Sequence, residues 1–302
     1  RLASPEAVGR YAAEHWGAGL AITEHRPSST DRSVYGWRYR ALRRDLKRAG
    51  GRAVVSTPFA EALRDYWRLG AWTSIALPVN DEVFDVPRPA DQDRRGETGK
   101  PLTVCHVSHL GRNKRPEETI RAVARLARAD LVAGREPTRL LLVGGEPHEI
   151  EPLRELARVE GIEQTSTFTG RVPHDEVAGL MAASDVFVLA SEVEAGGTVL
   201  AEAQALGLAC VATPTWAGRF MVEPETGVVL PAAAQRDDDA LVASLTEALA
   251  QVTDSIRAGG YLPEEIRARA RQRFGEATFV TACRELYEQA CNAITGSAES
   301  TQ

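Results

Sequence analysis

Short apolar segments alternate with helical segments along this chain, and this alternation limits its possible folds more than any other feature of the sequence. Apolar runs that predict strands occupy residues 102–107, 139–143, 165–169, 186–189 and 208–212. Strands separated by crossover helices form parallel sheets that are buried on both faces. The sequence therefore predicts an α/β protein built on parallel sheets.

The first 80 residues repeat this rhythm with fewer strands. The predicted elements are a helix that begins at Pro5, helices at 37–48 and from Thr57, and strands at 20–23, 53–56 and 74–77. A doubly wound domain uses about six strands. With about three, this region is expected to form only the second half of such a domain.

A chain of 302 residues is long enough for about two domains, each with its own core. Residues 85–100 combine prolines with Asp, Arg and Gly, a composition typical of an exposed linker. We therefore expect a partial first domain at 1–88, a linker at 89–100 and a second domain at 101–302. C-terminal helices within 263–294 are assigned to the second domain, with these buried anchors: Phe274, Phe279, Leu286 and Tyr287.

Composition excludes several classes of protein. A net charge of −6 argues against a nucleic-acid partner, whose phosphates require a basic surface. No apolar run approaches the roughly 20 residues of a transmembrane helix. The four cysteines lack the spacing of a zinc site or a disulfide framework, so reduced core thiols are expected. The absence of a signal peptide predicts a cytoplasmic protein, with peripheral membrane attachment as an alternative, and Arg1 in place of Met predicts a missing N-terminus.

Residues 191–207, SEVEAGGTVLAEAQALG, follow an apolar strand and open a helix. Gly196 and Gly197 allow a close backbone approach, and the free N–H groups of the helix that begins near Thr198 favour an anion such as a diphosphate. Glu194 and Glu202 flank this position and suit hydroxyl groups on either side of a diphosphate. The alternative for the two glutamates is a solvated helix face.

This segment resembles the signature of retaining glycosyltransferases of family 4 with the GT-B fold, Ser-x-x-Glu-Gly-Phe-Gly followed by Glu-Ala-x-Ala-x-Gly. Seven positions match: Ser191, Glu194, Gly197, Glu202, Ala203, Ala205 and Gly207. Ala195 and Gly196 replace the usual Gly and Phe. The resemblance implies that Glu194 holds hydroxyls of the donor sugar and that Glu202 holds the ribose. It also implies that the amides from Gly197 through Thr198 to Val199 bind phosphate oxygens.

The segment VSHLGRNKRPEETI resembles the family's Val-Gly-Arg-Leu-x-x-x-Lys loop, with Lys114 at the position of the diphosphate-binding lysine. Pro116 starts the next helix, which brings Lys114 to the same strand-end edge as Glu194. The family more often has Arg at the position of His109. Either a protonated His109 or Arg112 could replace it. The alternative for Lys114 is a solvated basic loop.

Three further positions follow from the resemblance. Gly144 and Gly145 end a strand that resembles the family's Leu-Val-Gly-x-Gly, which implies a loop close to the nucleotide, although a plain tight turn is an alternative. Val172 matches the position whose backbone receives the nucleobase, which leaves uracil and guanine both open. His25 occupies the strand end that faces the donor sugar, or it is a boundary residue satisfied by its neighbours.

The resemblance covers roughly residues 18–295 and implies two Rossmann-like domains, the first incomplete. It implies retaining, metal-independent sugar transfer, without a cofactor, from a UDP or GDP sugar to an unknown acceptor: a small molecule, a glycan or a lipid-linked glycan. Lys114 and the helix N-terminus, with Arg112 as a further candidate, would stabilise the departing diphosphate while Glu194 and His25 orient the sugar. Two alternatives remain: a nucleotide-sugar epimerase of the same fold and a non-catalytic donor-binding fragment.

Overall fold

The computed structural model describes residues 5–31, 33, 39–89 and 101–299. The chain forms two compact units, one of Arg1–Pro78 with Glu276–Gln302 and the other of Val79–Gly275. None of the described helices is both long enough and apolar enough to cross a membrane.

The second unit contains a parallel sheet of six strands in the order β6-β5-β4-β7-β8-β9. The strands are β4 (Thr103–Val107), β5 (Arg139–Val143), β6 (Ser166–Phe168), β7 (Val186–Leu189), β8 (Ala209–Ala212) and β9 (Gly227–Val229). Counted along the chain, this is the order 3-2-1-4-5-6 of a doubly wound domain. All four residues of β7 and of β8 are buried, as expected for a sheet covered on both faces.

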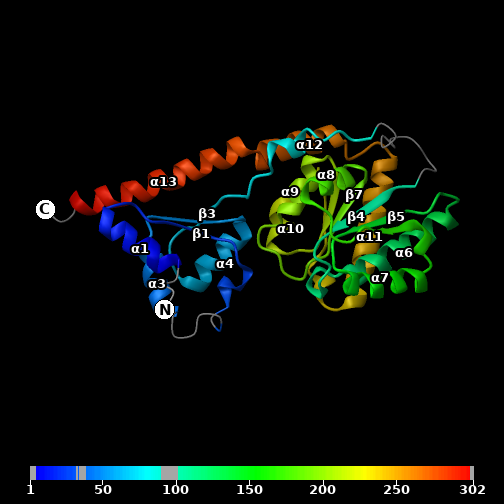
Figure 1. The fold of residues 1–302 in the computed structure, drawn as a ribbon, viewed down its shortest axis with the longest axis horizontal. Coiled ribbons are helices and arrows are strands. Elements are labelled where there is room, and N and C mark those ends of the chain that lie inside the picture. Colours follow the sequence, from blue (N-terminus) through cyan, green and yellow to red (C-terminus); the bar gives the residue numbers. More distant parts are fainter. Residues whose placement is uncertain (1–4, 32, 34–38, 90–100, 300–302) are drawn as a thin grey trace. The chain divides into compact units, whose positions relative to one another are not determined.

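Helices cover both faces of this sheet (Figure 1). One layer contains α6 (Pro116–Val132), α7 (Pro147–Val159) and α11 (Asp238–Arg257). The other contains α8 (His174–Ala182), α9 (Thr198–Ala205), α10 (Trp216–Met221) and α12 (Pro263–Phe274). The remaining elements are α5 (Asp81–Phe84) and the 3-10 turns η4 (Arg112–Lys114), η5 (Glu163–Thr165) and η6 (Ala232–Gln235).

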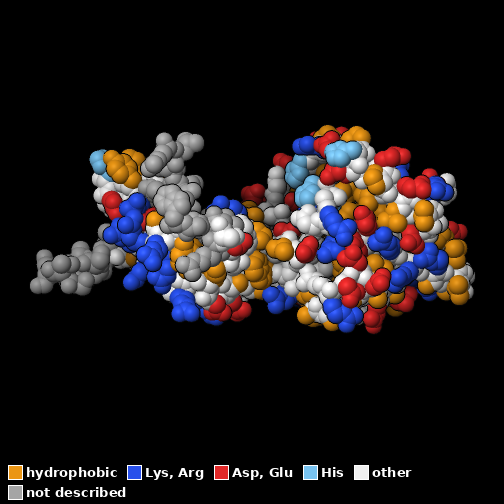
Figure 2. All heavy atoms as spheres, turned by 90° about the horizontal axis from the view of Figure 1, so that it is seen from below, with side chains coloured by type: hydrophobic (Ala, Val, Ile, Leu, Met, Phe, Trp, Pro, Cys, Tyr) orange, Lys and Arg blue, Asp and Glu red, His pale blue; other side chains and the backbone are white. Residues whose placement is uncertain are grey.

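The first unit has a parallel sheet of three described strands, β1 (Ala21–Glu24), β2 (Gly51–Val54) and β3 (Thr73–Ser74), in the order β1-β2-β3. Its other elements are α1 (Pro5–Trp16), η1 (Pro27–Thr30), α3 (Tyr39–Arg48), α4 (Thr57–Trp67) and α13 (Glu276–Glu299). In α3, five of ten residues are Lys or Arg. On the face shown in Figure 2, basic side chains gather over this unit, whereas acidic and basic side chains intermingle on the second unit.

The long C-terminal helix α13 belongs to the first unit, which corrects its assignment to the second domain. Leu286 packs with Ala53 and Ile75 of the first unit. A Cβ atom added at Gly51 would lie 2.9 Å from the Leu286 carbonyl oxygen, so the glycine lets α13 approach the sheet closely. The periodicity of a helix identifies its apolar face but not the sheet that covers it, which explains the error.

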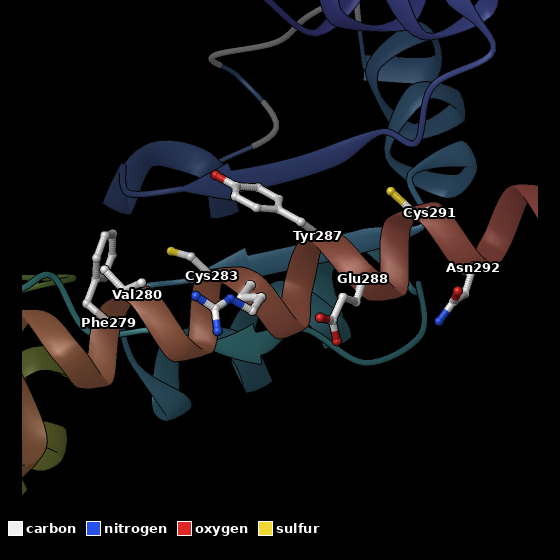
Figure 3. A pocket seen from close by; sticks show the side chains of 8 residues that line it. Phe279, Val280, Cys283, Tyr287, Glu288, Cys291 and Asn292 are labelled. Atoms are coloured by element: carbon white, nitrogen blue, oxygen red, sulfur yellow. The ribbon is translucent and has the colours of Figure 1, made fainter.

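Figure 3 shows the part of α13 that lines a cavity of about 760 Å³ in the first unit. Among the four predicted anchors, Phe274 and Leu286 are buried and Phe279 is half-buried. Tyr287 is 58% exposed and lines this cavity, so its prediction as a buried anchor was wrong. Cys105 and Cys210 lie in the core, whereas Cys291 is exposed.

The predicted boundaries differ from the observed ones in two further respects. Residues 79–89 belong to the second unit, although we placed the boundary at 88, and residues 90–100 of the predicted linker lie outside the described residues. Residues 37 and 38 of the predicted helix also lie outside them, and α3 begins at Tyr39. The sequence analysis missed β9, which has only three residues and begins with a glycine.

Candidate functional site

The order of strands in the second unit reverses between β4 and β7, the two strands at the centre of the sheet. The chain leaves β4 for α6 in one helix layer and leaves β7 for α9 in the other. In doubly wound folds the loops diverge at such a reversal, and ligands bind in the crevice beyond the carboxyl ends of the strands. The residues after β4 and after β7 are therefore the first place to look for a site.

Lys114 follows β4 and Glu194 follows β7, and their side chains meet. The Lys114 Nζ atom lies 2.6 Å from Glu194 Oε2, and the two side chains are 17% and 20% exposed. The loops also join through their backbones, because the Glu192 N–H group donates a hydrogen bond of 2.8 Å to the Asn113 carbonyl. Residues 80 positions apart in sequence thus place a cation and a carboxylate at the strand reversal.

The first turn of α9 begins at Thr198, four residues after Glu194. Gly197 caps this helix in the left-handed conformation, with φ of 61°. A Cβ atom there would lie 2.7 Å from the Cβ atom of Ala217, whose N–H group donates to the Glu194 carbonyl. The first intrahelical bond runs from Leu200 to Gly197, so the N–H groups of Thr198 and Val199 precede it. This turn therefore presents backbone donors beside the ion pair.

Glu202 lies about one turn into α9 and is half-buried. Burial raises the pKa of its carboxyl group, and the charge of His174 opposes that shift. Gly196, between Glu194 and Gly197, is also half-buried. As the sequence analysis expected, Glu194 lies just before α9 and Glu202 lies within it, with Gly196 and Gly197 between them.

The loop after β5 packs tightly against the loop after β4. Gly144 has φ of 107°, and a Cβ atom there would lie 1.9 Å from the Ser108 carbonyl oxygen. Gly145 has φ of 79°, and a Cβ atom there would lie 2.7 Å from Cδ1 of Leu110. Both glycines therefore have a structural reason to be present, in addition to their predicted place beside a nucleotide. Val172, two residues beyond Gly170 in the next loop, is half-buried.

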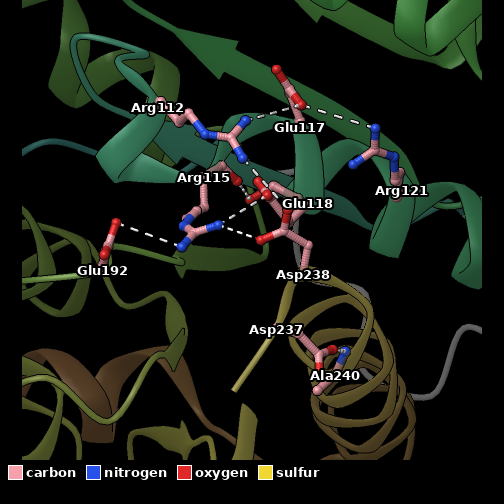
Figure 4. A network of polar contacts seen from close by, with 10 residues as sticks. Arg112, Arg115, Glu117, Glu118, Arg121, Glu192, Asp237, Asp238 and Ala240 are labelled. Atoms are coloured by element: carbon pink, nitrogen blue, oxygen red, sulfur yellow. Dashed lines mark hydrogen bonds and ion pairs between the residues drawn. The ribbon is translucent and has the colours of Figure 1, made fainter. Parts of the chain in front are cut away.

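The two candidates for the role of the family's arginine differ in their contacts. His109 is exposed, and its Nδ1 atom accepts a hydrogen bond of 3.0 Å from the Gly111 N–H group, so Nε2 holds the remaining donor position. Arg112 is 71% exposed and pairs with Asp238 at 3.5 Å and with Glu117 at 3.9 Å (Figure 4). Arg112 thus contacts the starts of α6 and α11.

The family model for glycosyl transferases of group 1 matches residues 87–272, well over half of the chain. The chain belongs to this family. The predicted resemblance to GT-B glycosyltransferases of the family 4 type is confirmed, as are the parallel sheets of its α/β fold.

Two curated glycosyltransferases illustrate the similarity. D-inositol 3-phosphate glycosyltransferase of Acidothermus cellulolyticus is 29% identical over 227 residues, which are 68% of this chain and 49% of that protein. GDP-mannose-dependent alpha-(1-6)-phosphatidylinositol monomannoside mannosyltransferase of Mycolicibacterium smegmatis is 31% identical over 216 residues, 66% of this chain and 53% of that protein. The chain spans about half the length of these curated relatives.

Among solved structures, HepE from Anabaena in complex with UDP and glucose is similar to this chain, with a TM-score of 0.64. The match covers 94% of this chain and 74% of that one at 20% identity, a level that establishes the fold.

His25, the predicted contact to the donor sugar, belongs to the first unit. It follows β1 at the carboxyl end of the strand, and its side chain is exposed. Its backbone N–H group donates a hydrogen bond of 2.9 Å to Glu24 Oε1. His25 therefore stands at a strand end as the sequence analysis expected, and its role in sugar binding stays a prediction.

Two residues near Lys114 escaped the sequence analysis. His106 in β4 is fully buried, and burial, followed by the charges of Lys114 and His109, lowers its pKa to about 4. Its Nε2 atom lies 2.9 Å from the Ser108 hydroxyl. Arg115 has a left-handed backbone, with φ of 56°, and connects three carboxylates. His106 could have been found from the sequence, because it is a polar residue within an apolar strand. No sequence feature predicts the left-handed backbone of Arg115.

Proposed function

We propose that this chain binds a nucleoside diphosphate sugar at the carboxyl edge of the six-stranded sheet and transfers the sugar, with retention of configuration, to an acceptor hydroxyl. The principal support is the contact between Lys114 and Glu194 at the strand reversal, beside the first turn of α9. A cation, backbone donors and a carboxylate at one point complement the two chemical parts of such a donor, its diphosphate and its sugar hydroxyls.

The ion pair suggests how the site would use its charges. Lys114 and Glu194 compensate each other at 2.6 Å in a partly shielded position. A diphosphate offers Lys114 a partner of higher charge, and the carboxylate that it releases can then accept hydrogen bonds from sugar hydroxyls. Binding of the donor would thus pair Lys114 with the diphosphate and leave the Glu194 carboxylate hydrogen-bonded to sugar hydroxyls.

The bond that breaks joins the sugar to the diphosphate, so negative charge develops on the departing phosphate oxygen. Lys114 and the N–H groups at the start of α9 would stabilise that charge without a bound metal. We assign Glu202 to the ribose, Val172 and the glycines after β5 to the nucleoside, and Glu194 with His25 to the sugar. These assignments rest on the family motifs and on the position of each residue after its strand.

Two of the similar proteins support a UDP or GDP donor. One relative is named for its dependence on GDP-mannose, and HepE was solved with UDP and glucose. Backbone recognition of the base leaves both open for this chain. The acceptor is proposed only as a class, namely a small molecule, a glycan or a lipid-linked glycan.

Calorimetry with UDP, GDP and the free nucleosides tests the proposal. We expect one diphosphate to bind and to raise the melting temperature, because it binds the folded state alone. Lys114→Ala should weaken the diphosphate by about one to two powers of ten and leave nucleoside binding nearly unchanged. Lys47→Ala, which removes an exposed lysine from α3, is the matched control. Failure of both diphosphates to bind the folded protein at millimolar concentration would reject the proposal.

A further inference from the structure

Arg115 adopts a backbone conformation that favours glycine. It caps the N-terminus of α6 with φ of 56° and ψ of 46°, in the left-handed region. An L-residue pays conformational free energy there, whereas glycine does not. An arginine at such a position, next to Lys114, suggests that its contacts compensate for the strain.

The Arg115 side chain connects three elements of the second unit (Figure 4). Its Nη1 atom lies 2.5 Å from Asp238 Oδ1 at the start of α11 and 3.3 Å from Glu118 Oε1 in α6. Its Nη2 atom lies 3.5 Å from Glu192 Oε2 in the loop after β7. The Arg115 side chain is 19% exposed, and Glu118 is almost completely buried. The guanidinium thus ties both loops of the strand reversal to α11.

The contact between Arg115 and Glu118 differs from the surface ion pairs around it. Arg112 and Arg121 both contact Glu117 at 3.9 Å, and all three side chains are at least 36% exposed. Exposed pairs of this kind contribute little, because water screens them and their side chains lose entropy. Arg115 is 19% exposed and Glu118 is 2% exposed, so water screens this pair less, whereas Asp238 and Glu192 are 49% and 58% exposed.

The position of Arg115 relates these contacts to the site. It directly follows Lys114, and its partner Glu192 lies two residues before Glu194. Its carbonyl oxygen accepts a hydrogen bond from the Thr119 hydroxyl at 3.1 Å. The Arg115–Glu192 pair thus joins the two loops on which Lys114 and Glu194 stand, in addition to the hydrogen bond from the Glu192 N–H group to the Asn113 carbonyl.

We propose that Arg115 is a positioning residue that holds Lys114 against Glu194 by joining the loops after β4 and β7. Its effect on donor binding rests on the proposed function, but its effect on the ion pair does not. The two consequences are therefore tested separately.

Lysine acylation tests the effect on the ion pair. The sequence contains only three lysines, Lys47, Lys100 and Lys114, so labelling of each by an amine-reactive ester can be measured by mass spectrometry. Arg115→Gly removes the side chain and keeps a backbone that glycine adopts freely. We expect the labelling rate of Lys114 relative to the exposed Lys47 to rise about threefold or more, as an ammonium group leaves its ion pair.

The matched control is Arg68→Gly. Arg68 caps the end of α4 with φ of 50°, so this variant makes the same change in the same backbone conformation, but in the first unit. Its Lys114 labelling should equal that of the parent. If Arg115→Gly fails to fold, Asp238→Asn removes the charge of one partner of Arg115 and should raise Lys114 labelling to a smaller extent. Unchanged labelling in the folded variant would overturn the proposal.

A double-mutant cycle tests the effect on binding. Arg115→Gly should weaken binding of the preferred diphosphate, UDP or GDP, by about tenfold in the parent background. In a Lys114→Ala background it should have almost no further effect, because Arg115 acts through Lys114. Equal losses in both backgrounds would indicate a general structural role and contradict the proposal. If the parent binds neither diphosphate, the proposed function fails, and the labelling result alone decides the role of Arg115.

Discussion

The two units share one local rhythm of strand and helix but differ in the order of their strands. In the second unit the order reverses between β4 and β7, and Lys114 and Glu194 meet there. The described strands of the first unit follow one another as β1-β2-β3, with no reversal among them. The comparison shows what the reversal adds: the loops diverge there, and side chains from distant segments of the chain can converge.

The units also differ in the origin of their cores. In the second unit, the sheet and its two helix layers come from one continuous segment, 79–275. In the first unit, Leu286 of α13 packs on Ala53 and Ile75, more than 200 residues away in sequence. The first sheet therefore depends on a contact of long sequence separation, and the two units should respond independently to core substitutions.

The largest loss of stability should follow a substitution just beyond the carboxyl end of β5, in the second unit. Gly144→Ala places a Cβ atom 1.9 Å from the Ser108 carbonyl oxygen in a backbone that disfavours alanine. Backbone strain and overpacking together should lower the free energy of unfolding by about 4 kcal/mol. Hydrogen exchange should locate the loss in β4 and β5 and leave β2 of the first unit unchanged.

Gly161→Ala separates backbone strain from overpacking. Gly161 has φ of 78°, but a Cβ atom there would meet no other atom within 4 Å. Its substitution should cost only about 1 to 2 kcal/mol, from backbone strain alone. Equal losses at the two positions would mean that the tight approach of the two loops contributes nothing.

Much of this architecture could be predicted from the sequence. The apolar runs at 139–143 and 186–189 coincide with β5 and β7, because fully buried parallel strands are continuous hydrophobic segments. Lys114 and Glu194 were predicted at the same edge, since both follow strands of one parallel sheet, and the structure brings them into contact. What escaped prediction depends on tertiary packing: the sheet that receives α13, the exposure of Tyr287 and the left-handed backbone of Arg115.

The next effect concerns a group buried beneath the site. The pKa of His106 is lowered from 6.5 to about 4, so the folded state keeps this imidazole neutral. Its contribution to stability is fully present above pH 6.5 and is lost as pH falls toward 4, because the unfolded chain binds the proton first. The loss at pH 4 should be on the order of 3 kcal/mol.

Urea denaturation at pH 7 and pH 4 measures this loss as a difference between proteins. His106→Gln should lose less stability than the parent over that interval, because it lacks the imidazole. The carboxyl groups titrate in both proteins, so their effect cancels in the difference. His148→Gln, at an exposed position of α7 in the same unit, should follow the parent. If His106→Gln shows the same pH dependence as the parent, then the buried imidazole is protonated in the folded state.

A smaller effect is expected in the first unit. Leu286→Ala removes the side chain by which α13 packs on the first sheet, and it should cost about 2 to 3 kcal/mol. Val280→Ala, at an exposed position of the same helix, should change stability by less than about 0.5 kcal/mol. Faster hydrogen exchange in β2 with unchanged exchange in β7 is the expected pattern. Faster exchange in both sheets would show that the units unfold together.

The smallest effect concerns the two glutamates, which are assigned to opposite ends of the donor. Glu194→Gln should not weaken binding of UDP or GDP, because its carboxylate competes with the diphosphate for Lys114, but it should weaken use of the full donor, whose sugar is assigned to that carboxylate. Glu202→Ala removes a charge-assisted hydrogen bond to the ribose, so it should weaken the diphosphate and the full donor alike by about 1.5 to 3 kcal/mol. Calorimetry with the diphosphate, its sugar conjugate and its 2′-deoxy analogue measures all three. The deoxy analogue should reproduce much of the loss in the parent and add little in Glu202→Ala. If the two glutamates are merely solvated surface residues, both variants will bind all three ligands as the parent does. That result would contradict the proposal that the second unit binds the donor.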